Sequence, residues 1–273
     1  RSATTVRKEL IDACPGLKLI GRGGVGMDNI DVDYARSTGI KVINTPAASS
    51  QSVAEQVMAH LFGAARSLYD SNRHMPVSGL SDFKKLKKKY AKGVELRGAT
   101  IGIIGFGRIG QSLASYALGC GMHVIAFDPY VPNATIHIKI ANQTVSTEIH
   151  TTSLDDLLAQ ANFISLHMPM PTDGNALIGN AEFSKMKDGV IIANAARGGV
   201  IDEDALLENL KSGKVAHAAL DVFINEPNPR EDLLQQTNIS LTPHTGAATL
   251  EAQDRIGEEL ASQIINYFQS ITA

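Results

Sequence analysis

The sequence contains few of the residues that would assign it to several broad classes of protein. It has no tryptophan and only two cysteines, Cys14 and Cys120, too few for the disulfide framework of a small secreted domain. We therefore expect a reduced, cytoplasmic protein. No apolar run approaches the roughly 18 residues that a membrane-spanning helix requires, so a membrane location is not expected. The chain opens at Arg1 without an initiator methionine, so its first residues do not decide targeting.

The charged residues, histidines and cysteines also form no pattern that is typical of a nucleic-acid or metal site. The net charge is −3, and without a basic stripe this value argues against nucleic acid as the main ligand. The lysine-rich run at residues 84–89, with Lys92, is more typical of a solvated helix face than of a phosphate or RNA site. No two histidines or cysteines have the spacing of metal ligands, and we interpret His137 and His150 as exposed polar residues. No metal site is predicted.

Residues 101–128 carry the clearest pattern in the chain. The apolar run at 101–104 predicts a buried strand, and it leads directly into the motif G-x-G-x-x-G. Residues 109–118 have the apolar period of a helix, and residues 124–127 predict a second strand that ends at Asp128. Strand, helix and strand in this order form a β-α-β unit.

This unit is suited to bind a dinucleotide. Gly105 allows a tight turn, Gly107 lets the backbone approach a pyrophosphate, and Gly110 lets the helix pack closely on the strand. The start of the helix offers unpaired N–H groups and a partial positive charge to the phosphates. Asp128 would bind the adenine ribose hydroxyls and repel a 2′-phosphate, so NAD is predicted rather than NADP. Arg108 could pair with the pyrophosphate or could be a solvated residue at the helix start.

A second G-x-G-x-x-G, formed by Gly21, Gly23 and Gly26, follows a predicted strand at residues 17–20. We reject it as a nucleotide site, because no apolar helix follows it and the next predicted strand, residues 41–43, does not end in an acid. The loop is still expected to bring its backbone close to something small.

The remaining elements predict two α/β lobes. Four further strands are predicted at residues 163–167, 190–193, 215–220 and 239–241. Helices are predicted over residues 5–13, 31–36, 52–72 and 249–268, and a surface β-hairpin over residues 135–149. Strands that alternate with helices indicate a doubly wound parallel sheet of the Rossmann type. We assign residues 1–45 to part of a substrate lobe, 46–246 to the NAD-binding domain, and 247–273 to a helix that completes the substrate lobe.

Ligands of a doubly wound sheet lie at the carboxyl ends of its strands, so the residues that follow each strand are candidates for the site. Arg197 follows the strand at 190–193, Glu226 follows the strand at 215–220, and His244 follows the strand at 239–241. Five other residues at the helix start or the strand ends are expected to contact the cofactor: Ile109, His167, Ala195, Asp221 and Gly246.

The motifs GFGRIG, ARGGVID, LDVFINEP and LTPHTGAAT together resemble those of the D-2-hydroxyacid dehydrogenase family. The resemblance implies a flavodoxin-like substrate lobe beside the NAD domain. It also implies that His244 is the acid/base, and that Glu226 pairs with it and stabilises the imidazolium. Arg197 would grip the substrate carboxylate by a two-pronged contact, which the backbone N–H groups of Val25 and Gly26 would complete.

Three further stretches, RSAT, GRGGVGMDNID and INTPAASSQSVAE, are similar to the members of the family that oxidise D-3-phosphoglycerate to 3-phosphohydroxypyruvate with NAD, the first step of serine synthesis. On that resemblance Arg1 and Ser2 would bind the substrate phosphate. Two departures are an absent β-α segment before RSAT and Ser49 in place of a frequent asparagine. Because the sequence continues only a few residues past the last predicted helix, serine feedback through a C-terminal regulatory domain is not expected.

Two alternatives stay open at this point. One keeps the chemistry but uses an unphosphorylated substrate such as glyoxylate, hydroxypyruvate, glycerate or lactate. The other is a non-catalytic protein that senses NAD, against which Arg197, Glu226 and His244 argue. The helix predicted over residues 52–72 has a broad apolar face from Ser52 to Leu68, which indicates a homodimer formed through the cofactor domains.

Overall fold

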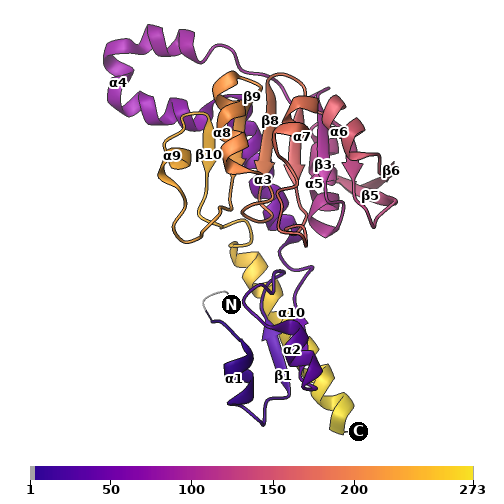
Figure 1. Ribbon diagram of the computed structural model, residues 1–273. Coiled ribbons are helices and arrows are strands. Elements are labelled where there is room, and N and C mark those ends of the chain that lie inside the picture. Colours follow the sequence, from indigo (N-terminus) through magenta and orange to yellow (C-terminus); the bar gives the residue numbers. More distant parts are fainter. Residues whose placement is uncertain (1–3, 273) are drawn as a thin grey trace. The chain divides into compact units, whose positions relative to one another are not determined.

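The computed structural model describes residues 4–272 and divides into two compact units (Figure 1). Unit 1 comprises residues 1–52 and 247–273, and unit 2 comprises residues 53–246. The first division thus falls after Ser52, whereas the predicted boundary follows Thr45. Within the described residues, no helix is both long enough and apolar enough to cross a membrane.

Unit 2 is built on a parallel sheet of six strands in the order β10-β9-β8-β7-β3-β4. The strands are β3 (Thr100–Ile104), β4 (His123–Phe127), β7 (Phe163–Leu166), β8 (Val190–Asn194), β9 (Val215–Leu220) and β10 (Ile239–Leu241). The order runs outward from β3 in both directions, which confirms the predicted doubly wound sheet. Each strand predicted in this sheet begins and ends within one residue of the observed strand, whereas the strand predicted at residues 17–20 of unit 1 is observed two residues later, at Leu19–Arg22.

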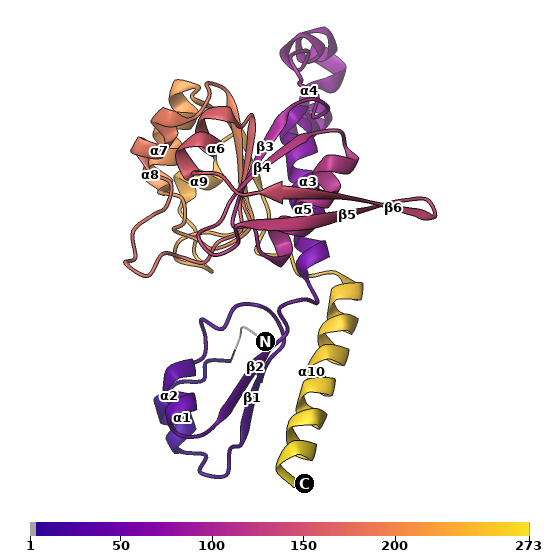
Figure 2. The ribbon, with the colours of Figure 1, turned by 90° about the vertical axis from the view of Figure 1, so that its right-hand side faces the viewer.

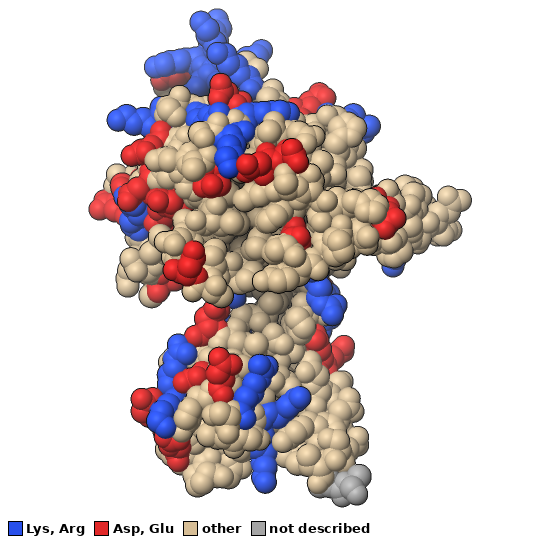
Figure 3. Space-filling model, turned by 45° about the vertical axis from the view of Figure 1, so that its right-hand side comes forward, with Lys and Arg blue, Asp and Glu red and all other residues tan. Residues whose placement is uncertain are grey.

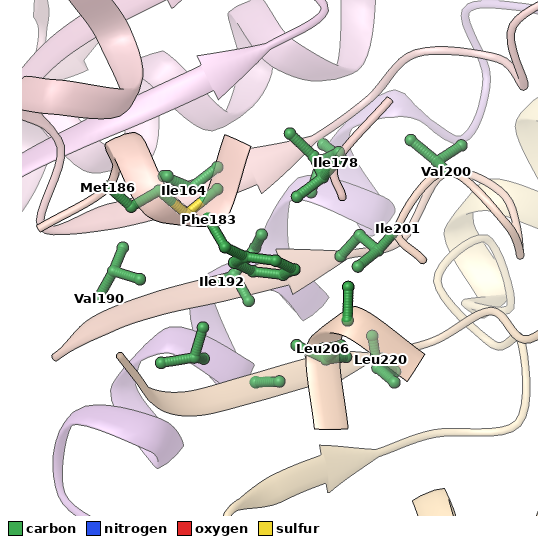
Figure 4. Packing of buried hydrophobic residues seen from close by; sticks show 14 of the residues in the cluster. Ile164, Ile178, Phe183, Met186, Val190, Ile192, Val200, Ile201, Leu206 and Leu220 are labelled. Atoms are coloured by element: carbon green, nitrogen blue, oxygen red, sulfur yellow. The ribbon is translucent and has the colours of Figure 1, made fainter. Parts of the chain in front are cut away.

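Helices cover both faces of this sheet because the side chains of each strand alternate between two cores (Figure 2). The helices of unit 2 are α3 (Ser50–Ala65), α4 (Leu68–Lys89), α5 (Arg108–Gly119), α6 (Leu154–Gln160), α7 (Asn180–Lys185), α8 (Glu203–Ser212) and α9 (Glu231–Leu234). Ile101 and Ile103 of β3 pack with α3 and α5, and Ile104 packs in the second cluster with α6, α7 and α8. That second cluster surrounds Phe183, which is fully buried (Figure 4).

The prediction of one helix over residues 52–72 is wrong. The segment forms two helices, α3 and α4, separated at Ser67, whose φ of 48° lies in the left-handed region that a right-handed helix cannot include. The apolar face of α3 is covered within its own unit, and Val57 and Leu61 have no exposed surface. The exposed lysines of residues 84–89 lie on α4, where Lys and Arg side chains crowd the surface (Figure 3), as predicted for a solvated helix face.

The predicted surface hairpin is confirmed as β5 (Asn133–Ile140) and β6 (Gln143–His150), which pair antiparallel. Its inner side is anchored by Ile136 and Ile149, which are buried in the same cluster as α5. His137 and His150 are exposed, as expected.

Unit 1 contains a pair of parallel strands, β1 (Leu19–Arg22) and β2 (Lys41–Asn44), in which Arg22 lies opposite Asn44. Its helices are α1 (Lys8–Asp12), α2 (Val32–Ser37) and α10 (Leu250–Thr272). The helix start predicted at Asp31 is confirmed, because the Asp31 carboxylate accepts a hydrogen bond from the Tyr34 N–H. A small core that includes Ile20, Ile40 and Val42 holds the strands against α1 and α2.

Candidate active site

The glycine motif forms a close turn between β3 and α5. Gly105 has a φ of 95°, and a Cβ atom there would lie 2.7 Å from the backbone carbon of His167. A Cβ on Gly110 would lie only 2.2 Å from the carbonyl oxygen of Gly105, whereas a Cβ on Gly107 would meet nothing within 4 Å. Packing inside the protein therefore explains why glycine is required at positions 105 and 110. Gly107 precedes the first residue of α5 and leaves open space beside the helix start.

Asp128 lies directly after β4 and fixes the shape of this turn. Its Oδ2 accepts a hydrogen bond of 2.7 Å from the Phe106 N–H, and its Oδ1 accepts bonds from the N–H groups of Tyr130 and Val131. A carboxylate oxygen accepts more than one hydrogen bond, so these contacts leave capacity for a ligand hydroxyl. Arg108, the exposed first residue of α5, places a cation at the same helix start.

His167 follows β7 and contributes an enclosed imidazole. Its Nε2 lies 2.9 Å from the Ser165 hydroxyl, and its Nδ1 is buried without a partner in the part of the chain that the structure describes. Burial lowers the pKa of His167 to about 4, so the ring is neutral at physiological pH. An unpaired buried nitrogen beside the glycine turn is suited to a hydrogen bond with a bound ligand.

Glu226 and His244 form a direct pair at the carboxyl ends of β9 and β10. The Glu226 Oε2 lies 2.8 Å from the His244 Nδ1, while Oε1 accepts a hydrogen bond of 2.9 Å from the Phe223 N–H. Both carboxylate oxygens are therefore engaged, and the carboxylate orients the ring so that Nε2 is the nitrogen left for a substrate. The two side chains keep 35% and 51% of their surface exposed, which lets a small molecule reach them.

Arg197 follows β8, the strand next to β9 in the sheet. Its Nη1, one of the two terminal nitrogens of the guanidinium, donates to the Ala196 carbonyl at 2.6 Å, and this contact orients the group. The neighbouring Gly198 is pressed against the loop that carries Glu226, since a Cβ there would lie 2.0 Å from the Phe223 carbonyl oxygen. The order β8-β9-β10 thus brings the loops of the three predicted catalytic residues to one edge of the sheet.

The other residues predicted to contact the cofactor lie on the same elements. Ile109 is in the first turn of α5, and Ala195 follows β8 directly. Asp221 follows β9 and is almost fully buried, and its Oδ2 accepts a hydrogen bond of 2.9 Å from the Gly246 N–H. This hydrogen bond therefore links the loop after β9 to the loop after β10.

The rejected glycine motif begins with Gly21 inside β1 and continues into the loop of unit 1 that follows this strand. Sequence reasoning missed two residues that shape this loop. Thr45, which is fully buried, accepts a hydrogen bond from the Gly24 N–H at 2.8 Å, and the amide of Asn44 donates to the Val25 carbonyl at 2.8 Å. Within the described residues the N–H groups of Val25 and Gly26 have no hydrogen-bond partner. The signal in the sequence is the polar pair Asn44-Thr45 at the end of β2.

Two predicted substrate residues, Arg1 and Ser2, lie outside the described residues. The described part of unit 1 places one further cation beside the loop, Arg22, the last residue of β1, whose Nη1 donates to the Gly23 carbonyl at 2.5 Å. Within residues 4–272 no group of three or more His, Cys, Asp or Glu side chains could hold a metal ion.

The geometry of unit 2 fits NAD. The open space at Gly107 and the N-terminus of α5 provide a place for the phosphates. Asp128, at the end of β4, provides an acceptor for the ribose hydroxyls, and the enclosed His167 Nδ1 provides a buried polar contact in the same sheet. Gly105, Gly107, Arg108 and Asp128 would hold the cofactor at its pyrophosphate and adenosine ends.

Comparisons with known proteins agree with this geometry. Residues 58–246 match the profile of "D-isomer specific 2-hydroxyacid dehydrogenase, NAD binding domain". A hydroxypyruvate reductase of Thermotoga maritima is 45% identical over 267 residues, which cover 97% of this chain and 82% of that protein. A D-3-phosphoglycerate dehydrogenase of Mycobacterium leprae is 42% identical over 97% of this chain but only 47% of that protein. The chain thus spans about half the length of the D-3-phosphoglycerate dehydrogenases that it matches.

Solved structures show the same similarity. The D-lactate dehydrogenase of Aquifex aeolicus, determined with NAD and lactic acid, is 31% identical with a TM-score of 0.78, and the match covers 97% of this chain and 80% of that one. A glyoxylate reductase from Paecilomyes thermophila is 35% identical with a TM-score of 0.74, over 91% and 72% of the two chains. The chain therefore belongs to the D-isomer specific 2-hydroxyacid dehydrogenase family of NAD-dependent oxidoreductases.

Proposed function

We propose that the protein oxidises D-3-phosphoglycerate to 3-phosphohydroxypyruvate, the first step of serine synthesis, and catalyses the reverse reduction. The observation that carries the chemistry is the hydrogen bond of 2.8 Å between Glu226 and His244 at the edge of the sheet where Arg197 follows β8. When bound, NAD supplies the site that accepts hydride from the substrate carbon, or NADH returns it.

His244 is the acid/base in this proposal. In oxidation its Nε2 accepts the proton of the substrate hydroxyl, and in reduction it returns that proton to the carbonyl oxygen. Glu226 stabilises the imidazolium that forms, because its Oε2 accepts from Nδ1 while the Phe223 N–H keeps the carboxylate in place. The proton therefore stays on a ring whose orientation is fixed.

Arg197 and the loop of unit 1 are proposed to bind the substrate carboxylate. A guanidinium forms two parallel hydrogen bonds with a carboxylate, and it also polarises an adjacent carbonyl. The N–H groups of Val25 and Gly26 supply two neutral donors for the same carboxylate. Asn44 and Thr45 occupy the neighbouring backbone groups of that loop and so leave these two donors for the ligand.

The phosphate is the feature that distinguishes the proposed substrate. It requires cations and hydrogen-bond donors. Arg1 and Arg22 of unit 1 are our candidate cations, and the Ser2 hydroxyl is our candidate neutral donor. A second candidate function, reduction of unphosphorylated hydroxypyruvate or glyoxylate, is favoured by one observation: the hydroxypyruvate reductase of Thermotoga maritima matches over 82% of its own length.

The deciding assay follows NADH oxidation with 3-phosphohydroxypyruvate and with hydroxypyruvate on the same preparation. A strong preference for the phosphorylated ketoacid that is lost in Arg1→Ala supports the proposal. An equal or reversed preference refutes the phosphate site and favours the second candidate. Loss of turnover in His244→Ala separates either enzyme from a protein that only binds NAD.

We also propose that the protein is a homodimer, and that α4 is the surface through which two copies associate. Val77 and Leu80 lie before the kink of α4 at Asp82 and are 85% and 106% exposed, and Phe83 lies just after it and is 57% exposed. Exposed apolar side chains that gather in one segment are typical of an interface. Sedimentation velocity at micromolar concentration tests this: Leu80→Glu should yield monomers, and Ser81→Glu, a change at an exposed polar neighbour, should not. A monomeric wild-type protein would refute the proposal.

A further inference from the structure

A buried hydrogen-bond network lies behind the loop that carries His244. Its centre is Asp221, whose Oδ1 accepts hydrogen bonds from the Gln56 amide at 2.7 Å, the Thr242 hydroxyl at 2.7 Å and the Thr245 N–H at 2.8 Å. Its Oδ2 accepts from the Gly246 N–H. The carboxylate thus binds the two residues that follow His244 and ties them to β10 and α3.

The network continues from Thr242 to His60 of α3, which is 7% exposed. The His60 Nε2 lies 3.1 Å from the Thr242 hydroxyl oxygen, and its Nδ1 lies 2.7 Å from the Ser240 hydroxyl. Burial lowers the pKa of His60, and the ring is therefore neutral at physiological pH. A neutral imidazole carries one proton, so one of its nitrogens donates and the other accepts.

The direction of each hydrogen bond follows from what the carboxylate requires. Because Asp221 only accepts, the Thr242 hydroxyl must give it its one proton. The oxygen of Thr242 already accepts from the Gln56 amide, which also donates to Asp221. The His60 Nε2 therefore donates to Thr242, and its Nδ1 accepts from Ser240. Every hydrogen bond in this series is directed toward Asp221.

His244 itself has no regular backbone to hold it. It has a φ of 53°, which is uncommon for a residue other than glycine and persists only where the surroundings enforce it. On one side Glu226 holds its ring, and on the other Asp221 holds the N–H groups of Thr245 and Gly246. The geometry of the acid/base thus depends on the position of the Asp221 carboxylate.

We propose that His60, Gln56 and Thr242 are positioning residues for His244, which act by holding Asp221, and that His60 does so as the Nε2–H tautomer. None of the three needs to touch the substrate. The proposal rests on the proposed role of His244. It differs from a role in core packing, because it requires a donor at the place of Nε2 and not a side chain of a particular volume.

Two pairs of variants test this requirement. His60→Leu and Thr242→Val remove the hydrogen-bonding group with little change in size, whereas His60→Gln and Thr242→Ser keep a donor or a hydroxyl in nearly the same place. We expect the first two to lower kcat for ketoacid reduction by about tenfold, because a misplaced general acid or base loses rate even when ligands still bind. The KM for NADH should stay within about twofold, and the second two should recover most of the loss.

Nitrogen-15 NMR of His60 in the wild-type protein gives a test that does not depend on turnover. The expected spectrum is that of a neutral ring protonated at Nε2. A ring protonated at Nδ1 overturns the proposal, as does a His60→Leu variant that keeps wild-type kcat or a His60→Gln variant that loses as much as His60→Leu. If the wild-type protein reduces no ketoacid, the proposed function fails, and the NMR measurement still decides whether the series of hydrogen bonds exists.

Discussion

Replacing Glu226 by glutamine should separate the charge of the carboxylate from its shape. The structure leaves the amide one comfortable orientation. Its oxygen must stay on the Phe223 N–H, because an amide nitrogen there would place two donors against each other. The amide nitrogen then faces the His244 Nδ1 and must donate to it. Nδ1 can accept only when it is unprotonated, so the variant disfavours the imidazolium that both directions of the reaction require.

The size of this effect follows from the contact that is lost. A hydrogen bond to a charged group contributes roughly 1.5 to 3 kcal/mol. Glu226 and His244 keep 35% and 51% of their side-chain surface exposed, so solvent screening favours the lower part of that range. A loss of about 1.5 to 2 kcal/mol lowers kcat/KM by roughly 13- to 30-fold, since each 1.36 kcal/mol is tenfold. The overall equilibrium constant does not change, so oxidation and reduction must lose the same factor.

The assay is NADH oxidation by the preferred ketoacid and the reverse reaction with the hydroxy acid, each at several pH values. Glu231→Gln, at an exposed acid on α9, is the matched control and should leave both rates unchanged. A Glu226→Gln enzyme that keeps wild-type kcat/KM in both directions would refute the role of the pair. A loss that is restored fully by raising the NADH concentration would show instead that the residue serves cofactor binding.

Three other variants test separate parts of the structure. Asn44→Asp replaces the donor to the Val25 carbonyl by an acceptor of the same shape. This change should raise the KM for the ketoacid by roughly tenfold and leave the KM for NADH unchanged. Steady-state kinetics of this variant, compared with those of Asn44→Gln, check the prediction. Burial lowers the pKa of His167 from 6.5 to about 4, so between these pH values only the unfolded state binds a proton at this residue. The free energy of unfolding should therefore fall by about 3 kcal/mol as the pH drops from 6.5 to 4. Urea titrations at several pH values measure this decrease in the wild-type protein, and His167→Gln should not show it. Gly198→Ala would push on the Phe223 carbonyl and should lower both kcat and the thermal midpoint, whereas Gly213→Ala, where a Cβ meets nothing, should lower only the midpoint through its positive φ.

The sheet of unit 2 was predictable because its signals are local. A buried parallel strand reads as a short apolar run, and glycine or a polar residue ends it, so β9 and β10 were placed at their observed bounds. Once the strands were known, Arg197, Glu226 and His244 followed from their places after β8, β9 and β10. The pairing of Glu226 with His244 came from the family resemblance, and the structure adds the distance and the Phe223 contact.

The parts that escaped prediction depend on contacts between distant residues. The apolar period of α3 continues past Ser67 into α4, so nothing in the sequence marks the break there. Asn44 reaches Val25 only because β1 and β2 pair in the observed register. His60 lies one turn after Gln56 on α3, and its partners Ser240 and Thr242 are 180 and 182 residues further along the chain.

The two groups of polar residues differ in what they hold, and this difference assigns each to a separate kinetic quantity. Asn44 and Thr45 fix backbone groups of the unit 1 loop. In the proposed function the N–H donors of that loop would bind a carboxylate, a contact that the bound substrate and the transition state would make equally. Such a contact changes KM more than kcat. Asp221 and its partners fix the residues beside His244. In the proposed function the proton of His244 would move only in the chemical step, so the loss of these partners should be expressed in kcat. Kinetic effects of variants therefore report which of the two groups a residue serves.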